Sequence, residues 1–253
     1  MCIIIFDGDN TLWDTNAVFT EAQLAILEEL RRFGVNIVPK DEFDKLRLID
    51  DMLIKKYQKH EYNFRVLCFA LYLHYKNKLS EEEAMQMAYD IFEKNMKYEG
   101  LDIADKCYDV FNKKLKQIPS LFDNVKKTLK YLKAVKCVLI LSSEGKKYRI
   151  MKILDEYDLK QFFVHISTEE KSIETFKKII SKISKYQETC SKKVFVVGDI
   201  LEREIFMGNK IGAITIYKPS YYKPNQKPKN KMEIPNYKIK EIGDIKNIVK
   251  SLL

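Results

Sequence analysis

The sequence predicts an α/β protein: a doubly wound, Rossmann-like parallel sheet with an all-helical cap domain inserted after its first strand. Three observations predict this. A short apolar strand pattern, CIIIF, opens the chain at residues 2–6, and only helical patterns follow until about residue 118. Helix and strand patterns then alternate, which is typical of parallel strands joined by right-handed crossovers. We therefore assign residues 1–15 and 119–253 to the α/β core and 16–118 to the cap.

The inserted segment contains amphipathic helical patterns in which apolar residues recur at three- and four-residue spacing. The first stops at Gly34, and Ser80 with Glu83 has the spacing of a capping box that starts the fourth. We expect helices over residues 20–33, 40–57, 62–76, 81–98 and 103–118.

The α/β core shows the alternation clearly. After the first strand, the expected strands are 136–143, 162–167, 192–199 and 213–217, and the expected helices are 121–135, 147–159, 173–186 and 202–211. Ligands in such sheets bind at the carboxyl ends of the strands, so functional residues are expected there.

Composition narrows the class of protein. The chain has 253 residues, 46% of them hydrophobic, which is enough for a large core. No apolar run approaches the length of a membrane span, and the N-terminus lacks the basic region of a signal peptide, so we expect a cytoplasmic protein. Its scattered cysteines form no CxxC pair and are expected to be reduced: Cys2, Cys68, Cys107, Cys137 and Cys190.

The formal net charge of +9 does not by itself indicate a nucleic-acid or membrane partner. Lysine and glutamate are mixed along the helices, as expected of solvated helix faces. A small anionic substrate is compatible with the same charge. Both a monomer and a homodimer remain open.

Asp7 and Asp9 directly follow the first strand. They could be turn residues. A calcium loop is excluded, because its sixth and twelfth positions are Leu12 and Val18 instead of Gly and Glu. Two carboxylates at this spacing could also divide a reaction, one attacking in its ionised form and the other donating a proton.

Polar residues also follow the later strands of the core. Taken together, these residues favour a chemical role for the two aspartates, and a metal between Asp7 and Asp199 would remove their repulsion. The further residues are Ser142 and Ser143, then Lys171 at a helix start, then Gly198 and Asp199, with Glu202 and Glu204 close behind.

In these residues the chain resembles the haloacid dehalogenase-like hydrolases, in the branch with a helical cap after the first strand. The family has four motifs: D-x-D-x-T, a strand ending in Ser or Thr, a Lys opening a helix, and G-D followed by a second acid. They match, in order, Asp7, Asp9 and Thr11; Ser142, with Ser143 as the alternative; Lys171; and Gly198, Asp199 and Glu204. The chain departs from the usual pattern where Ser172 replaces a proline and Glu204 an aspartate.

The resemblance implies a Mg²⁺-dependent phosphatase that acts on a small phosphorylated metabolite through an aspartyl-phosphate. It makes Asp7 the nucleophile and Asp9 the general acid and base. It assigns Mg²⁺ to the Asp7 and Asp199 carboxylates and the Asp9 carbonyl oxygen, with Glu204 or Glu202 in support. Lys171 and Ser142 would hold the phosphoryl oxygens.

Two other functions remain open. Dehalogenases of this fold resemble D-x-Y in the first motif and need no acid at the position of Asp9, so Asp9 favours phosphate esters. A phosphomutase also keeps this acid. A binding or scaffold protein could keep the fold without the chemistry.

Substrate selection is expected in the cap. Arg65 is a charge within an apolar helical pattern and could contact a substrate anion or extend to solvent. Trp13 could line the pocket or pack at the hinge to the cap. The segment 217–235 is basic and proline-rich, and it is expected to be an irregular loop that either steers anionic substrates or is simply solvated. Its lysines are Lys218, Lys223, Lys227, Lys229 and Lys231.

Overall fold

The computed structural model describes residues 2–59, 62–186, 193–221 and 226–252. The chain forms two compact units. We call Met1–Asn16 with Ile118–Leu253 the core unit, and Ala17–Gln117 the helical unit. Cys190 and Lys223, both named above, lie outside the described residues.

The core unit is built on a six-stranded sheet whose strands are all parallel, as the sequence predicts. The strand order is β3-β2-β1-β4-β5-β6. The strands are β1 (Cys2–Phe6), β2 (Val138–Ser142), β3 (His165–Ser167), β4 (Lys193–Gly198), β5 (Ile214–Tyr217) and β6 (Tyr237–Lys238).

The strand order places a topological switch point at the centre of the sheet. From β1 the chain adds β2 and β3 on one side and then returns to add β4, β5 and β6 on the other. In the register, Ile3 pairs with both Val138 of β2 and Val194 of β4. Crevices outside such switch points are the usual ligand sites of open α/β sheets.

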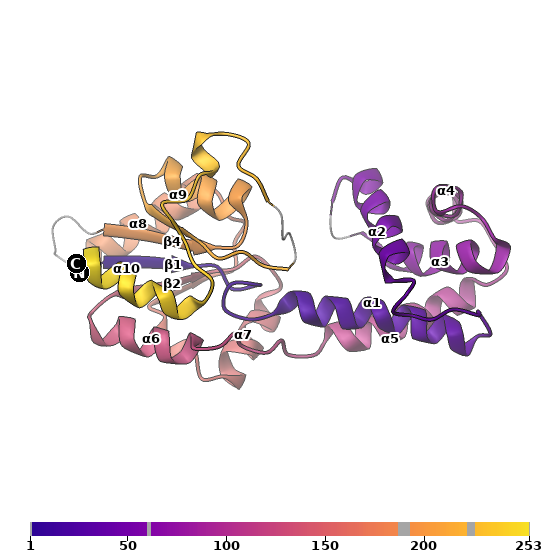
Figure 1. The fold of residues 1–253 in the computed structure, drawn as a ribbon, viewed down its shortest axis with the longest axis horizontal. Coiled ribbons are helices and arrows are strands. Elements are labelled where there is room, and N and C mark those ends of the chain that lie inside the picture. Colours follow the sequence, from indigo (N-terminus) through magenta and orange to yellow (C-terminus); the bar gives the residue numbers. More distant parts are fainter. Residues whose placement is uncertain (1, 60–61, 187–192, 222–225, 253) are drawn as a thin grey trace. The chain divides into compact units, whose positions relative to one another are not determined.

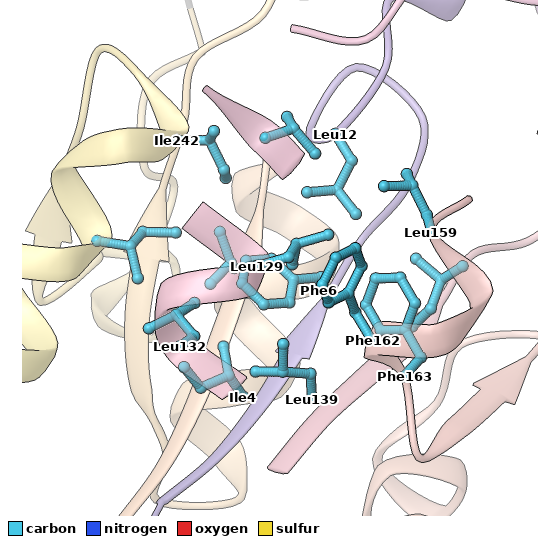
Figure 2. Close-up of a cluster of buried hydrophobic side chains, with 14 of the residues drawn as sticks. Ile4, Phe6, Leu12, Leu129, Leu132, Leu139, Leu159, Phe162, Phe163 and Ile242 are labelled. Atoms are coloured by element: carbon cyan, nitrogen blue, oxygen red, sulfur yellow. The ribbon is translucent and has the colours of Figure 1, made fainter. Parts of the chain in front are cut away.

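Helices cover both faces of this sheet (Figure 1). One face packs against α6 (Val125–Ala134), α7 (Lys147–Glu156) and α10 (Ile245–Leu252), and the other against α8 (Ile173–Tyr186) and α9 (Phe206–Lys210). Side chains of a strand alternate between faces, so Ile4 and Phe6 enter the first cluster and Ile3 and Ile5 the second. Figure 2 shows Ile4 and Phe6 among side chains of α6 and β2.

Some elements of the core unit differ from the sequence-based expectation. The expected helix 202–211 is a π-helical turn, η2 (Leu201–Ile205), that runs into α9. The expected strand 162–167 is only three residues long, because a 3₁₀ turn, η1 (Lys160–Phe162), precedes it. Further 3₁₀ turns are η3 (Lys231–Glu233) and η4 (Ile242–Asp244).

The helical unit contains helices alone among its described residues: α1 (Thr15–Arg32), α2 (Phe43–Tyr57), α3 (Arg65–Asn77), α4 (Glu81–Glu93) and α5 (Leu101–Leu115). The capping box is confirmed: the Ser80 hydroxyl accepts from the Glu83 amide, and the Glu83 carboxylate accepts from the Ser80 amide. Helix α4 ends earlier than its pattern suggests, and Asn95 just beyond it is left-handed, with φ of 49°. Helix α3 fills the centre of this unit's core with a nearly continuous buried run.

None of the described helices combines the length and apolar character that a membrane crossing needs.

Candidate active site

Asp7 lies at the carboxyl end of β1, where its backbone amide still bonds to Val197 of β4. Its carboxylate is buried. Oδ2 accepts from the Thr11 hydroxyl at 3.0 Å, and Oδ1 accepts from Lys171 Nζ at 2.5 Å. The central strand thus presents a carboxylate whose two oxygens have different partners.

Lys171 precedes α8, and its ammonium is buried between two carboxylates. Besides Asp7, Nζ donates to Oε1 of Glu204 at 2.6 Å, and the backbone amide of Lys171 donates to Glu144 Oε1 at 2.5 Å. Burial alone would disfavour the charge, but Asp7 and Glu204 outweigh it and hold the pKa of Lys171 above its ordinary value. The side chain therefore stays charged in the site.

Gly198 ends β4 and is required by the close approach of Glu204. A Cβ atom at residue 198 would lie 2.4 Å from Cγ of Glu204, which no ordinary contact allows. The glycine thereby lets the buried Glu204 side chain reach Lys171, while its other oxygen, Oε2, accepts from the Ile200 amide at 3.3 Å.

Asp199 follows β4 at the switch point and is also buried. Its Oδ2 accepts from the Ser220 hydroxyl at 2.6 Å. Burial and the nearby Glu204 carboxylate raise the pKa of Asp199 to about 6, whereas the hydrogen bond from Ser220 and the charges of Lys171 and Lys218 oppose the rise.

Asp9 is more open to solvent than Asp7, with 25% of its side chain exposed. The indole N–H of Trp13 donates to its Oδ1 at 3.0 Å, and so does Arg149 Nη1 at 3.2 Å. The hydroxyl of Ser143 lies 3.4 Å from Oδ2. Trp13 is fully buried and its indole N–H is used on Asp9, so it supports this loop.

Ser142, the last residue of β2, has a buried hydroxyl with no hydrogen-bond partner among the described residues. An orphaned buried hydroxyl at the edge of a site fits a group that waits for a ligand oxygen. Ser143 differs, because its hydroxyl already faces Asp9.

The two glutamates that follow β4 differ in their surroundings. Glu204 joins Asp7 and Lys171, as described above, whereas Glu202 is exposed and receives a 3.2 Å contact from Lys229 Nζ.

Arg65 belongs to the helical unit, where it pairs with Asp105 and its guanidinium lies over the Phe92 ring, 5.5 Å from its centroid.

The segment 217–235 does more than form an exposed loop. Lys218 is buried: its Nζ donates to the carbonyl of Asn10 at 3.1 Å and lies 3.6 Å from the centroid of the Phe122 ring. Gln226 donates to the Asp199 carbonyl at 2.8 Å and accepts from the Leu201 amide. This corrects the sequence-based view of Lys218 as one of a set of solvated lysines.

The sequence analysis missed three supporting residues, Arg149, Ser220 and Gln226, and gave Lys218 no supporting role. Each contacts a loop that carries a candidate acid. Arg149 resembles any charged residue in the first turn of a helix, and the other three lie in a polar, proline-rich stretch. Only the positions of Lys218 and Ser220, just after the strand that neighbours Asp199, offered a signal.

The charge balance of the cluster is unfavourable without a further cation. Burial raises the pKa of Asp7 well above its usual range; Lys171 opposes this, and the carboxylates of Glu204, Asp199 and Asp9 add to it. Three buried carboxylates, those of Asp7, Asp199 and Glu204, thus face two buried lysines, Lys171 and Lys218, so the cluster still has one carboxylate in excess. Such a donor set, made only of oxygen atoms, fits a hard divalent cation such as Mg²⁺.

Among the described residues, no three Asp, Glu, His or Cys side chains are grouped as a complete metal site. A site made of two carboxylates and one carbonyl oxygen would have no such third side chain. Mg²⁺ commonly binds in this way, through one or two carboxylates with water and substrate oxygens completing its shell.

Comparison with known proteins identifies the family. The model of the haloacid dehalogenase-like hydrolases matches residues 4–218. A search of curated protein sequences found no match.

Three solved structures with this fold illustrate the similarity, and each is 18% identical to this chain. One is the HAD-type hydrolase YfnB of Bacillus subtilis, solved with magnesium bound (98% of both chains, TM-score 0.59). Another is a predicted phosphoglycolate phosphatase of Haemophilus somnus 129PT (98% of both chains, TM-score 0.56). A third is a 2-haloacid dehalogenase of Pseudomonas syringae pv. tomato DC3000 (100% of both chains, TM-score 0.52).

The family match covers most of the chain, so this protein belongs to the haloacid dehalogenase-like hydrolases. This confirms the resemblance to the family, while the capped branch and the roles of the motif residues stay predictions.

Proposed function

We propose that the protein is a Mg²⁺-dependent phosphatase that hydrolyses a small phosphorylated metabolite through an aspartyl-phosphate. The observation that carries the proposal is the pair Asp7 and Asp9: one carboxylate is buried beside Lys171, and the other is partly exposed two residues later. The family also contains dehalogenases, which need no acid at the second position, so Asp9 favours phosphate esters.

In the first step, Asp7 attacks phosphorus, the bond from phosphorus to the ester oxygen breaks, and that oxygen takes a proton from Asp9. In the second step, Asp9 takes a proton from water as the water oxygen attacks phosphorus. The bond to Asp7 then breaks, which restores the carboxylate and releases phosphate. Lys171 and the Ser142 hydroxyl bind phosphoryl oxygens in both steps.

Mg²⁺ would be held by the Asp7 and Asp199 carboxylates and the Asp9 carbonyl oxygen, and Glu204 would orient Lys171 and bound water. When bound, the cation would neutralise charge where two anions must approach each other. The magnesium-bound YfnB structure supports Mg²⁺ as the cation, and the excess of carboxylates in the cluster supports a cation at this place.

We further propose that the helical unit acts as the cap that selects the substrate, with Arg65 as a candidate contact. The unit has its own hydrophobic core, so it can vary its surface without disturbing the sheet. No observation favours a phosphomutase over a phosphatase.

The test is turnover of p-nitrophenyl phosphate with Mg²⁺ and after removal of Mg²⁺ by EDTA. Metal-dependent release of phosphate is expected, and Asp7→Asn is expected to abolish it. A folded protein that releases no phosphate, from this ester or from a panel of phosphorylated metabolites, would favour a binding role for the fold.

A further inference from the structure

The two carboxylate oxygens of Asp9 have very different surroundings. Oδ1 accepts hydrogen bonds from Trp13 at 3.0 Å, from Arg149 at 3.2 Å and from the Thr15 hydroxyl. Among the described residues, the partner of Oδ2 is the hydroxyl of Ser143, at a long 3.4 Å. One oxygen is thus surrounded by donors, and the other is nearly free.

Arg149 connects these contacts. It lies in the first turn of α7, just beyond the carboxyl end of β2, and 28% of its side chain is exposed. Its Nη1 donates to Asp9, and its Nη2 donates to the Thr15 hydroxyl at 3.2 Å. A planar guanidinium can hold two partners in a fixed geometry in this way, which a lysine ammonium cannot do as rigidly.

The crowding of Oδ1 decides which oxygen carries the proton. A proton on Oδ1 would point into three groups that already direct their own hydrogens at that atom. In the described part of the chain, a proton on Oδ2 faces the Ser143 hydroxyl, which can rotate and accept it. The neutral acid is therefore protonated on Oδ2, with Oδ1 held by its donors.

We propose that Arg149 is a positioning residue that holds Asp9 through Oδ1, so that Oδ2 exchanges the proton with the leaving group and with water. This inference rests on the proposed phosphatase function and adds to it a residue outside the four family motifs. Arg149 acts through Asp9, so its removal should slow hydrolysis most for esters whose leaving group needs a proton.

The leaving group provides the readout. Benzyl phosphate releases a poor leaving group that needs a proton as its ester bond breaks. Nitrophenolate, released from p-nitrophenyl phosphate, is stable without one. The ratio kcat/KM covers all steps up to the transfer of phosphate to Asp7, so comparing the two esters isolates the acid step from the later hydrolysis.

The experiment compares wild type with Arg149→Met on both esters in the presence of Mg²⁺. We expect kcat/KM for benzyl phosphate to fall about 10- to 100-fold, and kcat/KM for p-nitrophenyl phosphate to fall much less. Lys152→Met is the matched control, because it removes one exposed positive charge from the same helix and should leave both values unchanged.

Equal losses on both esters, or unchanged or faster hydrolysis of benzyl phosphate, would overturn the inference while leaving the phosphatase function intact. If folded wild type releases phosphate neither from these two esters nor from the panel of phosphorylated metabolites, the proposed function fails and the inference with it. If Arg149→Met does not fold, Arg149→Lys replaces it. With a single ammonium in place of the guanidinium, kcat/KM for benzyl phosphate should fall more than kcat/KM for p-nitrophenyl phosphate. An unchanged ratio of these two kcat/KM values would count against the inference.

Discussion

The Ser220 hydroxyl donates a 2.6 Å hydrogen bond to Oδ2 of Asp199. The segment after β5 thereby supports the acid that follows β4, its neighbour in the sheet. Asp199 is a proposed metal ligand, and a hydrogen bond to one oxygen of such a carboxylate fixes the direction of the other.

Ser220→Ala should therefore weaken activation by Mg²⁺. Loss of an outer partner of a metal ligand typically costs about 10- to 100-fold in metal affinity. The measurement is phosphatase activity titrated with Mg²⁺. Ser251→Ala is the control, because Ser251 is exposed on α10, outside the proposed site, and its hydroxyl donates to the backbone carbonyl of Ile248. Equal Mg²⁺ requirements in wild type and Ser220→Ala would show that Ser220 is structural only.

Asp7→Asn should abolish turnover while the fold persists. Asparagine has the same shape but cannot attack phosphorus as a carboxylate. It also removes one of the charges crowded around Lys171, so the substitution should not unfold the protein at neutral pH. Activity and circular dichroism test the two parts, and residual phosphatase activity above background would argue against a covalent intermediate on Asp7.

Lys171→Met should destabilise the core unit strongly, because it leaves Asp7 and Glu204 buried without their shared cation. Breaking a buried ion pair by removing one partner typically costs about 3–5 kcal/mol. Adding Glu204→Gln should recover part of this loss, since one of the two unpaired charges is then removed. Urea unfolding of the single and double variants measures the effect, and a double variant less stable than Lys171→Met would contradict it.

In the helical unit, Asp50 gives a pH dependence of stability with a definite sign. Burial raises the pKa of Asp50 to about 6, while hydrogen bonds from the Tyr62 hydroxyl and the Gln23 amide partly oppose the rise. The folded-state pKa is above the unfolded value of 3.8, so the stabilising contribution is present below about pH 4. It is lost as the pH rises through 6.

Asp50→Asn should remove this dependence, because asparagine does not titrate, and Gln23 can turn its amide to keep its hydrogen bond to the new side chain. A two-unit shift corresponds to about 3 kcal/mol between pH 4 and 7. Urea unfolding of wild type and Asp50→Asn across this range is the measurement. A difference in unfolding free energy that stays constant with pH would mean that Asp50 does not titrate in this way.

The exposed lysines of the segment 217–235 test electrostatic steering. Neutralising Lys227 and Lys229 should lower kcat/KM for an anionic substrate at low salt and leave kcat nearly unchanged, since screened charges act on encounter and not on chemistry. The difference from wild type should shrink as salt is added. Identical kcat/KM values at low ionic strength would show that these two lysines serve only solubility.

The features that the sequence predicted well are those with a local signal. The strand Cys2–Phe6 is short, apolar and followed by turn residues, and Ser80 with Glu83 carries its own capping pattern. The alternation of helix and strand patterns along the sequence predicted the parallel sheet. By contrast, β6 is only two residues long, too short for any periodicity to appear.

The site was predicted only in part, because its supporting contacts join residues far apart in the chain. Arg149 meets Asp9, and Lys218 meets Asn10, across long stretches of sequence. A buried lysine has the same letter as a solvated one, and its burial depends on Phe122 and Asn10 being near it. Such contacts follow from the tertiary fold and leave no local pattern.

The central place of β1 in the sheet has a consequence for synthesis on the ribosome. Of the six strands of this sheet, β1 is made before the others. It is flanked by β2 and β4, so Ile3 cannot pair with Val138 or Val194 until those strands have been made. The helical unit, made within one continuous stretch, can fold earlier and alone. During this interval β1 is an apolar strand with two open edges, which is the kind of segment that chaperones protect from aggregation. Nascent chains stopped between the end of the helical unit and β4 should therefore engage such chaperones most strongly.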